Sequence, residues 1–81
     1  MKPGDLVVFK KEFDCDLYSD AFLKNINAKN RYTGKTITLG ATCIVLDIKK
    51  LYSNITGDKL VKVLTKEGVG WLYQDWVIKE K

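Results

Sequence analysis

The sequence predicts an all-β domain in which five short antiparallel strands curl into a small, partly open barrel. Runs rich in β-branched and aromatic residues recur along the 81-residue chain, and turn-forming residues separate them. Hydrophobic residues make up 46% of the chain, which is enough for a true core in a single domain. A barrel also disposes of the sheet edges that short antiparallel strands otherwise expose. We therefore expect residues 1–81 to fold as one domain.

The first strand is expected over residues 6–11, directly after a turn signal at residues 3–5. Its centre holds the β-formers Val7, Val8 and Phe9. Alternate side chains of this strand are expected to face the core.

Residues 12–39 are expected to form an enlarged first loop inserted into the barrel. A structureless connection of this length is unusual in so small a domain, so it either folds locally or is ordered by a partner. Apolar residues partly follow a helical period over 17–26, which leaves room for a short helix there. Residues 25–34 are rich in Asn, Lys, Thr and Gly, and we expect them to be exposed.

The β pattern returns from residue 36 onward. The segment 42–48 is the strongest strand in the chain because it is β-branched and almost wholly apolar at its centre. The segment 59–65 alternates charged and apolar residues, as a half-buried strand does. The other expected elements are a short segment of strand character at 36–39, a turn at 53–58, a tight hairpin connection at 66–68, a strand at 69–73, a single 3₁₀ turn at 74–76 and a closing strand at 77–79.

The residues do not support an enzyme, a metal site or a cofactor site. The chain has no histidine, the commonest general base and metal ligand. Cys15 and Cys43 lack the spacing of a zinc site, and two free thiols are favoured over a disulfide between them. Cys15 stands between two aspartates, which should raise its pKa and make it a poor nucleophile.

Charge divides the expected loop into two halves, although the whole chain is only mildly basic at +4. The acidic half is favoured as a solvated face because it lacks the ligands of a calcium loop and the partners of a catalytic acid. Its members are Glu12, Asp14, Asp16 and Asp20. The basic half is favoured as a solvated loop over a phosphate-binding surface. Its members are Lys24, Lys29, Arg31 and Lys35, with Tyr32 between them.

Residues 70–77, GWLYQDWV, resemble the end of an SH3-like barrel. There a Gly-Trp-apolar strand is followed by a short turn and an aromatic-Val pair. Residues 3–8 (PGDLVV) and 40–46 (GATCIVL) look like the first two strands of small SH3-like proteins encoded by tailed bacteriophages. The resemblance covers residues 3–11 and 40–79 and leaves out the loop at 12–39.

The resemblance implies an SH3-like barrel that acts as a protein-interaction or structural module, as a virion component or as an adaptor on a larger assembly. The proline that precedes the Asn-Tyr pair of eukaryotic SH3 domains is absent here, which disfavours a standard PxxP site. No apolar run is long enough to span a membrane or to act as a signal peptide, so we expect a protein of the host cytoplasm or the virion.

Large aromatic side chains serve either as core or as contact surface. Trp71 or Trp76 is expected to be mainly structural, whereas Tyr73 and Tyr52 are better candidates for exposure. The contact surface is expected on the 12–39 loop and the barrel aromatics: Tyr18, Phe22, Lys24, Lys29, Arg31, Tyr32, Lys35, Tyr73 and Trp76. The favoured partner is another protein, and an oligomer is compatible with this surface. The alternative is a nucleic-acid-binding barrel of the KOW type that uses the basic segment 24–35.

Overall fold

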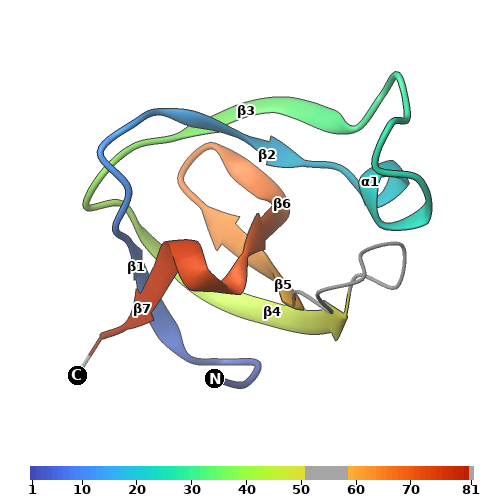
Figure 1. The fold of residues 1–81 in the computed structure, drawn as a ribbon. Helices are drawn as coiled ribbons and strands as arrows, with labels where there is room; N and C mark the ends of the chain where they lie inside the picture. The colour runs from blue at the N-terminus through green and yellow to red at the C-terminus, as the bar shows by residue number, and fades with distance from the viewer. Residues whose placement is uncertain (51–58, 81) are drawn as a thin grey trace.

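The computed structural model describes residues 1–50 and 59–80 and shows an all-β chain with two short helical turns (Figure 1). This confirms the predicted class. The elements in chain order are β1 (Leu6–Phe9), β2 (Cys15–Tyr18), α1 (Asp20–Lys24), β3 (Tyr32–Ile37), β4 (Thr42–Lys50), β5 (Lys59–Thr65), β6 (Gly68–Tyr73), the 3₁₀ turn η1 (Gln74–Trp76) and β7 (Val77–Lys79). The turn expected at 53–58 and the position expected for Tyr52 lie outside the described residues.

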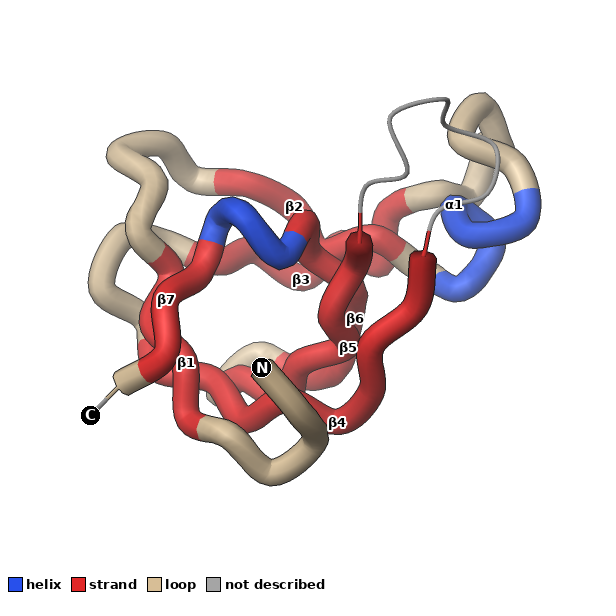
Figure 2. Tube along the Cα trace, turned by 60° about the horizontal axis from the view of Figure 1, so that its bottom comes forward, coloured by secondary structure: helices blue, strands red, loops and turns tan. Residues whose placement is uncertain are grey.

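Within the described part of the chain, seven antiparallel strands form one sheet in the order β3-β2-β6-β5-β4-β1-β7. The predicted number of five strands is therefore wrong. The sheet is strongly curved, and Figure 2 shows its strands arranged around a common centre. Strands β3 and β7 are its two edges.

The two additional strands lie in the segment that the sequence predicted as an enlarged loop. Residues of β2 and β3 pair as an antiparallel hairpin, with Cys15 opposite Ile37 and Tyr18 opposite Tyr32. Helix α1 falls inside the 17–26 window, but the first two residues of that window belong to β2. Tyr18 also pairs with Trp71 of β6, and this joins the hairpin to the rest of the sheet.

The core divides into two clusters that lie on opposite sides of β5 and β6, because Leu60 and Trp71 alternate along these strands with Val61 and Leu72. The larger cluster consists of Val7, Phe9, Leu17, Ile37, Cys43, Val45, Val61, Val63, Leu72 and Val77, each no more than 4% exposed. The smaller one consists of Phe22, Leu60 and Trp71. Of the two tryptophans, one of which was predicted to be structural, Trp71 is the buried one, with a side chain that is 2% exposed.

Strand β2 approaches β6 closely because β6 carries a glycine at the crossing point. A Cβ atom on Gly70 would overlap the Cβ of Leu17, so only glycine lets the buried leucine sit there. The same glycine directly precedes Trp71 in the sequence. The packing of the β2–β3 hairpin against β6 thus depends on the Gly70-Trp71 pair, which belongs to the segment that resembles the end of an SH3-like barrel.

Candidate functional site: an aromatic face

Five aromatic side chains from separate elements meet on one side of the molecule. We call this surface the aromatic face; it comprises Phe13, Tyr18, Tyr32, Tyr73 and Trp76. They come from the β1–β2 connection, β2, β3, the end of β6 and η1. Four of them were predicted as contact residues from the sequence.

Tyr18 is the centre of this arrangement. Its ring stacks on Phe22 at a centroid distance of 3.8 Å and on Tyr32 at 5.2 Å. It also meets Tyr73 edge-on at 5.9 Å and lies 6.5 Å from Trp76. Aromatic rings prefer offset-stacked and edge-to-face contacts at such distances, so each neighbour helps to fix the ring of Tyr18.

The other end of the face is built around Trp76. Tyr73 lies 5.0 Å from its ring centroid, and Phe13 meets it edge-on at 5.7 Å. Phe13 in turn contacts the buried Phe9 at 6.3 Å. Phe13 was not predicted as a site residue. In the sequence Phe13 stands between two acidic residues. A solvated loop does not require a large aromatic side chain, and this was the only indication that Phe13 has another role.

The face rests on a buried layer that is held by a polar contact. Phe22 lies in this layer, at 4% exposure, so its prediction as a surface contact is corrected. Trp71 lies beside it, and its indole N–H donates a hydrogen bond of 2.6 Å to Asp20 Oδ1. Asp20 stands in the first turn of α1, so this bond anchors the helix to β6. The acidic half of the segment is thus partly structural.

The five side chains of the aromatic face remain accessible to solvent. Phe13 is 49% exposed and Tyr32 is 45% exposed, while Tyr18, Tyr73 and Trp76 are half-buried. Burial raises the pKa of Tyr18 to about 12, with the neighbouring Tyr32 and Tyr73 adding to the shift. The Tyr18 hydroxyl is therefore neutral at physiological pH.

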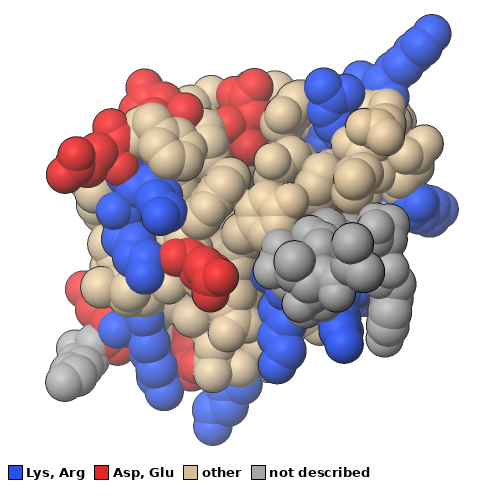
Figure 3. All heavy atoms as spheres, in the orientation of Figure 1, with Lys and Arg blue, Asp and Glu red and all other residues tan. Residues whose placement is uncertain are grey.

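Opposite charges border the two ends of the aromatic face. The guanidinium carbon of Arg31 lies 5.1 Å from the ring centroid of Tyr32. At the other end, Glu12 and Asp14 flank Phe13 and are exposed. Figure 3 shows acidic side chains at the upper left, with basic side chains directly below them, and further basic side chains at the upper right.

The other predicted basic residues are distributed over different parts of the surface. Lys24 lines a hollow of about 760 Å³ together with Lys49, Lys50 and Lys62. The aliphatic stem of Lys35 passes beside Gly68 in the β5–β6 turn. Together with the exposed Lys29, they form no single basic strip along the aromatic face.

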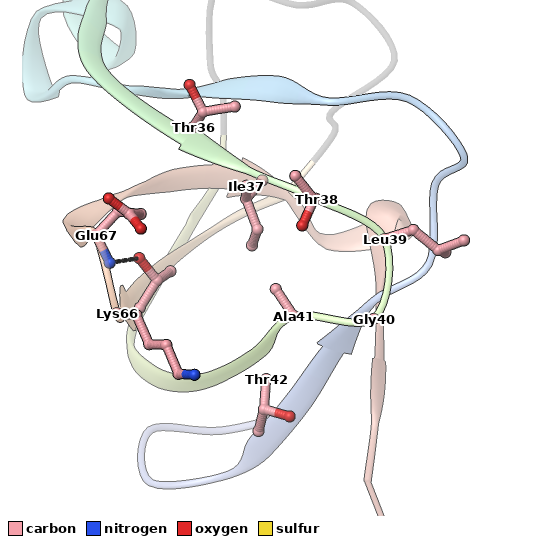
Figure 4. A pocket seen from close by; sticks show the side chains of 10 residues that line it. Thr36, Ile37, Thr38, Leu39, Gly40, Ala41, Thr42, Lys66 and Glu67 are labelled. Atoms are coloured by element: carbon pink, nitrogen blue, oxygen red, sulfur yellow. Dashed lines mark hydrogen bonds between the residues drawn. The ribbon is translucent and has the colours of Figure 1, made fainter.

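A second hollow, of about 470 Å³, lies between the β3–β4 connection and the β5–β6 turn (Figure 4). Its lining is mainly threonine and aliphatic, with Lys66 and Glu67 at the rim. The Glu67 backbone N–H is held by Thr65 Oγ1 at 3.0 Å. None of the predicted contact residues lines this hollow, and its groups make no nucleophile–base pair.

Both cysteine thiols have a raised pKa. Burial raises the pKa of the Cys43 thiol to about 11, and burial with the nearby Asp16 and Asp14 raises that of Cys15 to about 11. Both are free thiols, protonated at neutral pH. Residues 1–50 and 59–80 contain no cluster of three or more metal-ligating side chains.

Helices in the described part of the chain are all too short and too polar to cross a membrane. Comparison of the chain with protein-family models, with curated proteins and with solved structures finds no match.

Proposed function

We propose that this chain is a non-catalytic protein-interaction module, an SH3-like barrel that binds an extended segment of a partner protein across the aromatic face. The observation that carries the proposal is the convergence of five partly exposed rings from five separate segments onto one rigid surface. An adaptor or virion role on a larger assembly, as the sequence resemblance implies, is the setting we propose for it.

Burial alone does not account for the exposed rings. Phe22 and Trp71 already fill the space beneath Tyr18 and Tyr73, and the larger cluster lies beneath Trp76, so the outer rings leave apolar surface in water that folding does not cover. Aromatic side chains lose little conformational entropy on binding, and they concentrate binding energy at protein interfaces. Aromatic-lined surfaces of this kind recognise extended, polyproline-like segments in several domain families.

The charges at the ends of the face favour one orientation of the bound segment. A basic group of the segment would lie near Glu12 and Asp14, beside Phe13. An acidic group or a carbonyl would lie near Arg31, beside Tyr32. Such pairs at the rim contribute more to specificity and association rate than to affinity.

The experiment is selection of a random-peptide display library on the immobilised full chain. We expect enriched peptides with proline or apolar residues and a basic residue at one end. A Trp76→Ala variant should lose these peptides, whereas Ile44→Ala, which removes an exposed side chain of β4, a strand that contributes no residue to the face, should retain them. Equal recovery by the wild type and the Trp76→Ala variant would overturn the proposal.

A further inference from the structure

Four lysines from three separate elements surround one hollow in the surface. We call it the lysine hollow; its volume is about 760 Å³, and Lys24, Lys49, Lys50 and Lys62 line it. Lys24 ends α1, Lys49 and Lys50 end β4, and Lys62 lies in the middle of β5. The described lining includes no residue of the aromatic face. The hollow is therefore a second feature of the surface, apart from the proposed peptide site.

Positive charge is concentrated in the lysine hollow. Its described lining of nine residues contains the four lysines and two aspartates, so it has a net charge of +2, half of the +4 of the whole chain. Both carboxylates already accept internal hydrogen bonds. Asp20 Oδ1 accepts one from the Trp71 indole N–H at 2.6 Å, and Asp47 Oδ1 accepts one from the backbone N–H of Ile48 at 2.8 Å. The groups that remain for a ligand are therefore the lysine ammonium groups.

These lysines form no salt bridge with another residue in the described part of the chain. Lys62 is the direct cross-strand partner of Asp47, yet its Nζ lies 5.9 Å from the Trp71 ring centroid, and this ring lines the same hollow. Lys50 stands directly opposite another lysine, Lys59, and like charges in such a pair destabilise an antiparallel ladder. An anion bound between α1 and these strands would relieve the repulsion.

The chemistry of the lining favours phosphate over carboxylate groups. The described residues of the lining include no arginine, whose planar fork pairs bidentately with carboxylates. The lysine ammonium group is a compact point charge with three donors and no fixed plane, which suits the tetrahedral oxygen shell of a phosphate. A terminal phosphate group also carries about −1.5 to −2 at neutral pH, so one or two such groups match the charge of the hollow.

The shape of the hollow favours a compact ligand. Small-molecule sites typically have volumes of about 300–1,000 Å³, and this hollow falls within that range. Its lysines converge from three elements, whereas an extended nucleic-acid backbone requires a basic strip. We infer that the lysine hollow binds a compact polyphosphate, whose phosphate groups lie among the lysines of α1, β4 and β5.

Titration calorimetry of the full chain with tripolyphosphate, at constant ionic strength, tests this inference. A Lys24→Gln/Lys49→Gln variant removes one ammonium group from α1 and one from β4, and it should weaken binding by about tenfold or more. The control Lys29→Gln/Lys35→Gln removes the same charge from two exposed lysines outside the described lining, and it should change the affinity by less than about twofold. Thermal unfolding checks that both variants are folded.

A ¹H–¹⁵N spectrum locates the bound ligand. We expect tripolyphosphate to shift the Trp71 indole N–H and the backbone amides of Lys49 and Lys50, which line the hollow, while the Trp76 indole of the aromatic face stays in place. A separate titration with ATP distinguishes two sources of the phosphate groups. Equal affinity for both ligands indicates that the phosphate chain alone is recognised, and tighter binding of ATP indicates a nucleotide.

The inference would be overturned if tripolyphosphate did not bind up to about 5 mM. Citrate, a compact tricarboxylate, binding as tightly as tripolyphosphate would contradict the choice of phosphate. Duplex DNA binding more tightly than tripolyphosphate through the same lysines would contradict a compact ligand, and an equal loss of affinity in the control variant would contradict the location. Peptide capture is measured on a different surface, so either proposal can fail without the other.

Discussion

Trp71 combines burial in the core with a fixed polar contact. Its ring packs in one cluster with Phe22 and Leu60, and its N–H donates a hydrogen bond to Asp20. Five residues further on, Trp76 has a half-buried ring in the aromatic face. Two tryptophans that look equivalent in the sequence therefore have different roles, one structural and one at the surface.

Substituting each tryptophan by alanine should separate these roles. Trp71→Ala is expected to lower the free energy of unfolding by about 3–5 kcal/mol, which is enough to unfold a domain of this size. Trp76→Ala should cost distinctly less stability and should instead abolish peptide capture. Urea unfolding followed by circular dichroism measures both variants. If Trp71→Ala were as stable as the wild type, the assignment of the smaller core cluster would be wrong.

The individual elements show where the sequence was informative. Three segments were predicted with the bounds that the structure has: 59–65, 74–76 and 77–79. The first alternates charged and apolar residues, the second has a turn signal, and the third begins with apolar residues. Strands β2 and β3 were missed. In β2 only Cys15 and Leu17 are apolar, and they alternate with aspartates, a period-two signal too short to outweigh the loop-like composition around it. In β3 the positive φ of Gly34 interrupts a polar strand.

The missing hairpin also explains which parts of the candidate site could be predicted. Composition identified Tyr18, Tyr32, Tyr73 and Trp76 one by one. Their meeting on one face follows from the pairing of β2 with both β3 and β6, a long-range contact that local patterns do not encode. Phe22 is the opposite case. It lies in a segment that was predicted to be an exposed loop, yet its side chain is buried because α1 packs against Trp71.

The basic residues of the 12–39 segment provide a test at the scale of this hairpin. Replacing Lys24, Lys29, Arg31 and Lys35 by serine should leave the fold intact, because three of these side chains are exposed and Arg31 is only half-buried. Thermal unfolding should confirm this. A separate titration tests binding. Wild-type protein titrated with generic DNA and RNA at low salt should show no steeply salt-dependent binding. Such binding in the wild type, lost in the serine variant, would support the nucleic-acid alternative against our proposal.

For the whole molecule, the buried thiols and Tyr18 predict a loss of stability at alkaline pH. Burial raises the pKa of Cys43 from 9.0 to about 11 and that of Tyr18 from 10.0 to about 12. Above the unfolded-state values the unfolded chain releases protons that the folded chain retains, so the unfolded state is favoured. The stabilising contribution is therefore complete below about pH 9 and declines as the pH rises from about 9 to 12.

Urea unfolding at a series of pH values measures this decline. A Cys15→Ser/Cys43→Ala variant, whatever its stability at pH 7, should show a shallower fall between about pH 9 and 11. An identical slope in the variant would show that the thiols do not differ between the folded and unfolded states.

The most direct test of the aromatic face is a ¹H–¹⁵N spectrum of the full chain titrated with a peptide enriched from the library. We predict that the Trp76 indole and the backbone amides of Tyr18, Tyr32 and Tyr73 shift most, while the amides lining the hollow at 36–42 stay in place. The largest shifts at that hollow, with an unchanged Trp76 indole, would contradict the account.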